Sequence, residues 1–397
     1  MGCRPVLVNV AEPGHGQIGT GAFDPPVLSD DGNVVAFVTS DFLTAEDHDG
    51  SWDVYTRDLH RHDTALTSVS SDGAQCGGVF PPYISGDGRY VGFSGCSAGP
   101  LVPPPSGTVG TYVFVKDRVT GAIEHIGIPE QLELPGGGFG FLDRDGSHIV
   151  ILCFPEPSDE VAASVCLQDR RTLETTVVAR RTDGEIVRAF AVAMSVSDDG
   201  RLVAFVAPLA DVIPGSSDTR RQLFVRDAVA GVTNPVTISP SVLSGDLEGR
   251  ISGDGTAAVV WQTEPPYHIV HKDLLSGVVR RVDQARCEDV AGSPTPPYAS
   301  ISDDGDVVAF HSGSEGLVPH DTNDHADIFA WRATAPCTLQ RISTGPGLRE
   351  GDDDSNYPEV SGDGTSVAFV SEATNFVRDD INGTSDAFVV RLAPRLP

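Results

Sequence analysis

Long hydrophobic runs and basic residues are both scarce in this sequence. No apolar stretch approaches the roughly 18–20 residues of a membrane-spanning helix, and no signal-peptide core follows the first residues. Lys and Arg number 27 against 56 Asp and Glu, so the formal net charge is −29. Nucleic acid and anionic membranes repel so acidic a chain, which makes metal ions and cationic ligands better-matched partners. These absences predict a protein that binds no nucleic acid, does not span a membrane and is cytoplasmic as written.

Several linear enzyme motifs are absent as well. The sequence contains no His-Glu-x-x-His, no Cys-x-x-Cys and no Gly-x-x-x-x-Gly-Lys-Ser/Thr phosphate loop. Their absence excludes the enzymes that depend on such motifs, and it indicates no organic cofactor. It does not exclude an enzyme that assembles its site from single residues on separate segments.

A repeated unit fills the chain instead. Asp-Gly pairs spaced 50 to 59 residues apart lie at Asp31-Gly32, Asp87-Gly88, Asp145-Gly146, Asp199-Gly200, Asp254-Gly255, Asp304-Gly305 and Asp363-Gly364. Each pair is followed by a short apolar run, usually of the Val-Ala-Phe kind. A two-residue Asp-Gly link favours a tight hairpin because Gly accepts positive φ. A third apolar run follows the hairpin, and in the copies before the last one a fourth run follows it, so we expect four strands per unit.

Seven such units predict an all-β fold, a seven-bladed β-propeller of four-stranded antiparallel blades. Residues Pro5–Val10 precede the first unit, whereas the last unit ends after its third strand at Arg391. We therefore expect the N-terminal strand to complete the last blade and close the ring, which favours a monomer. The whole chain is then one domain, 1–397, with blades near 24–72, 79–130, 138–185, 191–240, 248–285, 297–345 and 356–392 plus 5–10.

Six cysteines form pairs that could meet within or between neighbouring strands: Cys76 and Cys96, Cys153 and Cys166, and Cys287 and Cys337. Spacing leaves open whether they form disulfides or behave as small buried apolar residues. Disulfides would indicate an oxidising compartment, and thus an exported protein whose signal was removed, instead of the cytoplasm.

Three loops between predicted second and third strands share the pattern Asp-x-[Asp/Asn]-[Gly/Asp]-x-x-Asp. Side-chain oxygens at alternate positions, with a carboxylate beyond them, suit a hard cation such as calcium. In the alternative, these residues bond their own backbone and only form a turn. The candidate metal ligands are Asp47, Asp49, Asp53, Asp321, Asn323, Asp327, Asp380, Asn382 and Asp386. We expect calcium in at least one loop, with 380–386 the first choice.

The fifth blade has the shortest predicted loop between its second and third strands, residues 263–267. The short loop leaves a notch, and Trp261, Tyr267, His268 and His271 lie close to it. An aromatic-rich notch can hold a ligand. In the alternative, Trp261 is a core residue and the two histidines alternate across a strand.

Two pieces recur along the chain: Ser-x-Asp-Gly-x-x-Val-Ala-Phe, as at 361–369, and Asp-Val-Tyr-Thr-Arg-Asp at 53–58 with its relative Leu-Phe-Val-Arg-Asp at 223–227. They resemble the repeats of TolB-type, WD-repeat-like propellers. The resemblance implies the propeller fold, but this repeat serves both as a protein-docking platform and as a domain beside hydrolases. We predict a non-catalytic propeller, calcium-stabilised, that binds a protein or small ligand on its loop face. The alternative is an enzyme (lyase, cyclase or hydrolase) with its active site at the mouth of the central channel.

Overall fold

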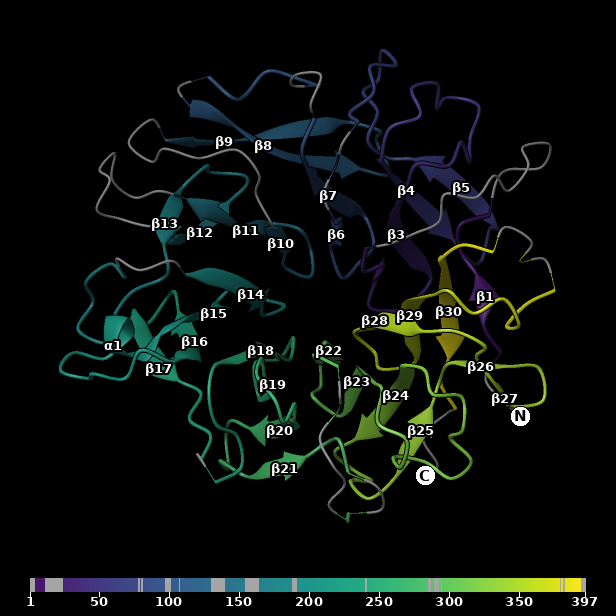
Figure 1. The fold of residues 1–397 in the computed structure, drawn as a ribbon. Helices are drawn as coiled ribbons and strands as arrows, with labels where there is room; N and C mark the ends of the chain where they lie inside the picture. Colours follow the sequence, from purple (N-terminus) through teal and green to yellow (C-terminus); the bar gives the residue numbers. More distant parts are fainter. Residues whose placement is uncertain are drawn as a thin grey trace.

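The computed structural model is a ring of seven four-stranded antiparallel sheets (Figure 1). It describes residues 4–10, 24–77, 79, 81–96, 101–106, 108–129, 140–153, 164–187, 191–239, 241–284, 287–288, 293, 295–378, 380 and 383–393. The first strands of neighbouring sheets contact one another around the whole ring. In these described ranges the only helix is α1 (Leu209–Val212), and no helix has the length and apolarity to span a bilayer. The predicted all-β, seven-bladed propeller is confirmed.

The first four blades follow one another along the chain. Blade 1 comprises β2 (Val27–Leu28), β3 (Val34–Thr39), β4 (Asp53–Asp58) and β5 (Asp63–Leu66). Blade 2 comprises β6 (Tyr83–Ile84), β7 (Tyr90–Ser94), β8 (Thr108–Asp117) and β9 (Ile123–Pro129). Blade 3 comprises β10 (Gly140–Leu142), β11 (His148–Cys153), β12 (Ser164–Asp169) and β13 (Thr175–Val177). Blade 4 comprises β14 (Val192–Val196), β15 (Leu202–Pro208), β16 (Arg221–Asp227) and β17 (Val232–Pro235).

The remaining three blades complete the ring. Blade 5 comprises β18 (Leu247–Ile251), β19 (Ala257–Gln262), β20 (Ile269–Asp273) and β21 (Val279–Arg281). Blade 6 comprises β22 (Ala299–Ile301), β23 (Val307–Ser312), β24 (Asp327–Arg332) and β25 (Leu339–Arg341). A separate hairpin, β26 (Thr344–Gly345) and β27 (Arg349–Glu350), leads to blade 7, which comprises β28 (Ser355–Val360), β29 (Ser366–Ser371), β30 (Asp386–Arg391) and β1 (Val6–Leu7).

The N-terminal strand closes the ring as expected. In blade 7, Val6 pairs with Val389 and Leu7 with Phe388 across β1 and β30. Antiparallel pairing of the chain's first strand with its last removes two strand edges that an open array would expose. The seventh blade is therefore built from both ends of the sequence.

The Asp-Gly turns are wider than the two-residue link that we expected. In blade 1 the residues between β2 and β3 are 29–33, and only Gly32 has a positive φ, +62°. The Gly32 N–H donates to the Ser29 carbonyl, 2.8 Å, as in a type I turn followed by a left-handed residue. Ser29 Oγ donates to Asp31 Oδ1, 2.7 Å, and accepts from the Val34 N–H, 3.0 Å. The serine therefore fixes the turn together with Asp and Gly.

The same turns tie neighbouring blades together through the backbone. Seven N–H groups donate to the next blade's turn: Asp30 to Gly86, Asp87 to Arg144, Arg144 to Asp198, Asp198 to Gly253, Asp254 to Asp303, Asp303 to Gly362 and Asp363 to Asp30, at 2.8–3.3 Å. These hydrogen bonds form a closed circle at one end of the inner strands. The circle brings the residue that precedes each Asp-Gly pair to the axis of the ring.

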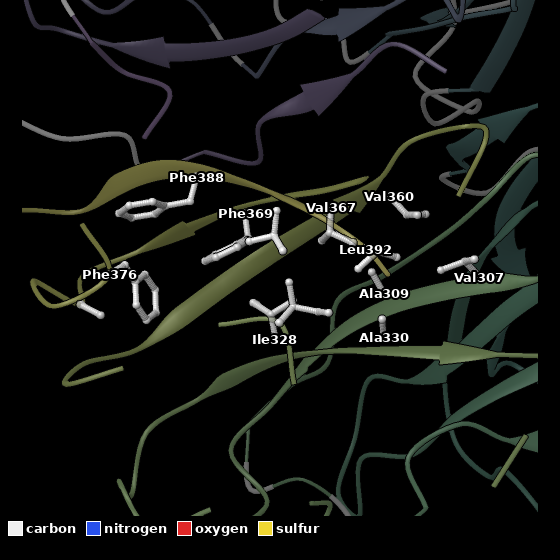
Figure 2. Close-up of a cluster of buried hydrophobic side chains, with 13 residues drawn as sticks. Val307, Ala309, Ile328, Ala330, Val360, Val367, Phe369, Phe376, Phe388 and Leu392 are labelled. Carbon is white, nitrogen blue, oxygen red and sulfur yellow. The ribbon is translucent and has the colours of Figure 1, made fainter. Parts of the chain in front are cut away.

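The hydrophobic core lies between the blades. Figure 2 shows the layer between blades 6 and 7, where Phe369, Phe376 and Phe388 lie together and Ile328 faces them from blade 6. Phe369 stacks on Phe388, directly opposite on β30, with ring centroids 5.8 Å apart. Fully burying one such side chain contributes about 1.5–3 kcal/mol. Each blade therefore depends on its neighbours for part of its core.

Three disulfides join the cysteine pairs that the spacing suggested. They are Cys76–Cys96, Cys153–Cys166 and Cys287–Cys337, with Cα atoms 4.5, 5.8 and 4.7 Å apart. The second pair links the adjacent strands β11 and β12 of blade 3.

Candidate ligand-binding channel

The inner strands surround a central channel whose two ends differ. Antiparallel pairing places the Asp-Gly turns at one end, which we call the turn face, and the connections between second and third strands at the other, the loop face. A pocket of about 360 Å³, the channel pocket, includes Pro25, Pro81 and Pro82, which precede the inner strands, and so lies toward the loop face. A smaller pocket of about 150 Å³ lies at the turn face. The two share wall residues, including Leu28 and Ile84, so they are consecutive parts of one channel.

One wall of the channel pocket carries a polar cluster, the channel triad, made of Arg250, Tyr298 and Glu359. Arg250 Nη1 lies 2.5 Å from Glu359 Oε1, and the Tyr298 hydroxyl donates to the same oxygen, 2.7 Å. The Arg250 guanidinium also contacts the Tyr298 hydroxyl and lies 4.9 Å from the centroid of its ring. The three residues come from blades 5, 6 and 7, so only the closed ring brings them together.

Burial and charge fix the protonation of this cluster. Burial lowers the pKa of Arg250, but the Glu359 carboxylate and Tyr298 outweigh it, and the pKa lies above its ordinary value. Burial raises the pKa of Tyr298 well above its ordinary value. At neutral pH the cluster therefore contains a guanidinium and a neutral phenol. Arg250 Nε is buried and has no hydrogen-bond partner in the described part of the chain.

Tyr357 lies beside the channel triad on β28. The pairing of β28 with β29 shifts between Asn356 and Glu359, and Tyr357 has φ +54°, which a bulky side chain rarely adopts. Its side chain is 38% exposed, and its ring packs edge-on against Tyr298 at 5.6 Å. Bulges often lie next to binding sites because they redirect a side chain. Here the bulge holds an exposed aromatic ring against the triad.

Four charged side chains, the channel ring, surround the turn-face end: Asp30, Arg144, Asp198 and Asp303. Arg144 Nε lies 3.0 Å from Asp30 Oδ2, and Nη1 lies 3.4 Å from Asp198 Oδ2. Burial raises the pKa of Asp30 to about 6 against the opposing effect of Arg144, and burial with the charges of Asp30 and Asp198 raises the pKa of Asp303 to about 7. The other three blades have Gly at this position, and a Cβ at Gly253 would collide with Asp198.

The structure does not bring the four predicted notch residues to one surface. Trp261 and His271 are each 3% exposed, and His271 Nε2 lies 2.9 Å from the Gly305 carbonyl. His268 is half-buried, with Nδ1 2.9 Å from Asp283 Oδ2, and Tyr267 is half-buried as well. Trp261 and His271 thus lie where the core alternative places them, and ligand binding by this group stays a prediction.

The three predicted metal loops differ from one another. In blade 1, Asp47 and Asp53 are buried and Asp49 is exposed, and ligand oxygens of all three lie within 4.8 Å of one another. Burial, together with the charges of Asp49 and Asp47, raises the pKa of Asp53 to about 7. This acidic cluster could hold a metal ion.

In the other two loops, some of the candidate ligand side chains already bond to other groups of the protein. In blade 6, Asp321 and Asp327 contact Arg341, and Asn323 Nδ2 donates to the Gly351 carbonyl, 3.1 Å. In blade 7, the buried Asp386 accepts a hydrogen bond from Asn9 Nδ2, and Asp380 is described, whereas Asn382 lies outside the described residues.

Two short runs of the sequence have the spacing of an enzyme motif and lie wholly or partly outside the described residues. Gly95-Cys96-Ser97-Ala98-Gly99 has the form Gly-x-Ser-x-Gly. A nucleophile elbow requires a strand–turn–helix, whereas this run lies between strands β7 and β8, and Ser97 is outside the described residues. The run 14–19 has Gly-x-Gly-x-x-Gly spacing and also lies outside them, between strands β1 and β2.

Sequence reasoning missed the channel triad and the channel ring. Arg250 and Glu359 lie in strand segments that carry no recognisable motif, 109 positions apart. One signal was available, because the residue immediately before Asp-Gly in each repeat is either charged or Gly. The restriction to charged residues or Gly marks the turn position that reaches the axis of the ring.

Comparisons with known proteins support the propeller fold and assign nothing more specific to this chain. No protein-family model and no curated protein sequence matches the chain. Hydrazine synthase from Kuenenia stuttgartiensis matches with a TM-score of 0.50 and 14% identity, over 96% of this chain and 99% of that one. A prolyl endopeptidase matches with a TM-score of 0.55 and 13% identity, over 94% of this chain and 50% of that one. A candidate TolB from Agrobacterium tumefaciens matches with a TM-score of 0.45 and 12% identity, over 85% of this chain and 97% of that one. At such identities the likeness shows a β-propeller fold alone.

Proposed function

We propose that this protein is a non-catalytic β-propeller that binds a small ligand in the channel pocket, toward its loop face. The observation that carries the proposal is a concave pocket of about 360 Å³ with apolar walls and the channel triad on one side. Small-molecule sites are typically mostly apolar, with a few convergent polar groups that orient the ligand. Side chains such as Leu28, Ile84 and Phe141 supply the apolar wall.

The chemistry of the walls favours a compact apolar ligand with one neutral hydrogen-bond acceptor. Arg250 Nε is a buried donor without a partner in the described residues, and such a donor costs about 1–3 kcal/mol. A ligand carbonyl oxygen that accepts from it would recover part of this cost. An anion is less suited, because Glu359 already balances the charge of Arg250 and the chain carries a net charge of −29.

We propose binding in preference to catalysis because the triad contains no nucleophile beside a base. The raised pKa of Tyr298 keeps its phenol protonated at neutral pH, and its hydroxyl already donates to Glu359. The arrangement resembles a preformed hydrogen-bonding wall more than a proton-transfer site.

Saturation-transfer NMR can test the proposal with neutral aromatic ketones as probes, alongside matched carboxylates and hydrocarbons. The variant Val27→Trp fills the channel pocket, and Val229→Trp places the same side chain on a surface site that is 81% exposed. We expect the ketones to bind the parent protein and Val229→Trp, and to bind Val27→Trp much more weakly. Equal signals from all three proteins, or a preference for the carboxylates, would contradict the proposal. Chemical conversion of a probe would favour the enzyme alternative.

We also propose that calcium stabilises the loop face. The close carboxylates of Asp47, Asp49 and Asp53 support this, because calcium takes oxygen ligands from acidic loops. Added calcium should raise the melting temperature, and chelator should reverse the rise. Stabilisation should reach about 2.7 kcal/mol at a hundred times the dissociation constant. If neither calcium nor chelator changes the melting temperature, these residues only form the turn.

We further propose that the protein acts as a monomer in an oxidising compartment. Three disulfides support the compartment, because such bonds are rarely kept in a reducing cytoplasm. Closure of the ring by β1 supports the monomer. Thiol labelling of the purified protein should find one reactive cysteine of seven, and sedimentation should give the mass of one chain. Seven reactive thiols would show that the disulfides do not form and would contradict the proposed oxidising compartment.

A further inference from the structure

We infer that the acidic loop of blade 1, residues 47–53, binds a divalent cation at the place that the guanidinium of Arg341 fills in blade 6. The inference rests on the proposed calcium stabilisation and assigns it to one loop. It comes from comparing two blades of the same chain, which blade 7 separates in the ring (Figure 1).

The two loops end in the same way. Asp53 and Asp327 begin the third strands of their blades and are 0% and 1% exposed. In each, Oδ1 accepts a hydrogen bond from a serine two residues beyond the outer strand: from Ser68 Oγ at 2.5 Å in blade 1 and from Ser343 Oγ in blade 6. The serine Oγ also accepts from the N–H that follows each Asp, at 3.0 Å in both blades. The two carboxylates are therefore held in equivalent positions.

The correspondence extends to the segment beyond the outer strand. Gln75 and Glu350 occupy the same place in a short bridge that follows each fourth strand. Gln75 Oε1 accepts from the His48 N–H, 3.3 Å, and Glu350 Oε1 accepts from the Thr322 N–H, 2.9 Å. His48 and Thr322 are the second residues of the two loops. The backbone at the start and at the end of the blade 1 loop therefore has the same contacts as the backbone of the blade 6 loop.

The last residue of the outer strand differs in charge between the two blades. Arg341 lies opposite Phe329 in blade 6, and Leu66 lies opposite Tyr55 at the same position in blade 1. Arg341 Nη1 contacts three carboxylates: Asp321 Oδ1 at 3.2 Å, Asp327 Oδ2 at 3.2 Å and Glu350 Oε1 at 2.8 Å. The side chain of Leu66 cannot supply such a charge.

Blade 1 therefore has three carboxylates at the equivalent place, and no Lys, Arg or His of the described residues forms an ion pair with them; the Tyr55 hydroxyl donates to Asp47 Oδ2. Asp53 Oδ2 corresponds to the Asp327 oxygen that contacts Arg341, and it is buried with no hydrogen-bond partner in the described residues. A buried carboxylate oxygen without a donor or a cation is strongly unfavourable. Asp47 and Asp49 bring further oxygens within 4.8 Å, and Asp49 is exposed, so solvent reaches the group.

The ligand set selects the class of cation. Carboxylate oxygens without Cys or His favour a hard divalent ion, and calcium accepts irregular sets of protein oxygens more readily than magnesium does. The loop of blade 7 is left out of the assignment because Asn382 lies outside the described residues.

Calorimetric titration of the full chain with calcium chloride, after treatment with a chelator, tests the inference through reciprocal variants. Asp49→Asn should weaken binding at least tenfold, whereas Asp183→Asn, an exposed carboxylate in blade 3, should not change it. Leu66→Arg supplies blade 1 with the built-in cation and should abolish its site. Arg341→Leu removes that cation from blade 6 and should add one bound calcium per chain.

The outcomes separate this inference from the proposed calcium stabilisation. If the parent protein binds calcium but a folded Arg341→Leu gains no site, or a folded Leu66→Arg keeps the blade 1 site, the inference is overturned and the stabilisation stands. If Asp49→Asn, an exposed change that should leave folding intact, binds calcium as the parent does, blade 1 is not the site. If neither the parent nor Arg341→Leu binds calcium, both fail.

Discussion

Replacing Asp303 by Asn should stabilise the ring at alkaline pH and leave it unchanged in acid. Burial and the charges of Asp30 and Asp198 raise the pKa of Asp303 to about 7 from its ordinary value of 3.8. The folded protein thus holds this proton more tightly than the unfolded chain does. The resulting stability is present below about pH 4 and is lost as the pH rises through 7. At about 1.4 kcal/mol for each tenfold difference in proton affinity, the loss reaches about 4 kcal/mol.

Solvent at the channel mouth screens these charges, so we expect a measured effect of about 2 kcal/mol. Urea unfolding of the parent, Asp303→Asn and Glu372→Gln at pH 4 and pH 8 measures it. Asn resembles the protonated carboxyl, so the parent and Asp303→Asn should have nearly equal stability at pH 4, and the variant should be more stable at pH 8. Glu372 is exposed and should show no such pH dependence. Equal stability of Asp303→Asn and the parent at pH 8 would refute the electrostatic argument for the channel ring.

Three further predictions concern closure, cross-links and the channel triad. Deleting residues 1–12 removes β1, so thermal unfolding should shift to lower temperature and light scattering should show aggregation; unchanged melting and monodispersity would count against this closure. Replacing Cys76 and Cys96 by Ser frees a loop of 20 residues and should lower the free energy of unfolding by about 3 kcal/mol in denaturant titrations, and no loss would argue against the bond. Glu359→Gln leaves the Arg250 charge unbalanced and should lower the free energy of unfolding by about 3 kcal/mol, more than replacing both Arg250 and Glu359 by Leu does. A double-mutant cycle that shows no coupling between these two residues would contradict the pairing.

Local sequence was sufficient to predict the fold because each repeat carries its own turn and strand chemistry. Within residues 361–369, Gly364 supplies the positive φ, and Val-Ala-Phe supplies a strand whose Phe369 stacks on its neighbour. The ring closure was also predictable, because a fourth strand stood at the start of the chain and a third at its end. The predicted turn of two residues was too short, because the serine also belongs to the turn: Ser361 Oγ donates to Asp363 Oδ1 and accepts from the Ser366 N–H.

The candidate site was decided by the tertiary structure. Arg250, Tyr298 and Glu359 are single residues on three blades, and no linear pattern links them, because a propeller collects its channel wall from one position per inner strand. The acidic loops show the same limit. The sequence by itself determined that the loops of blades 1 and 6 share a spacing of oxygens, whereas only the folded chain decided that Arg341 reaches one of them and Leu66 lies beside the other. A side chain on the neighbouring strand sets the charge balance of each loop, and strand pairing, which acts across the sheet, is what places it there.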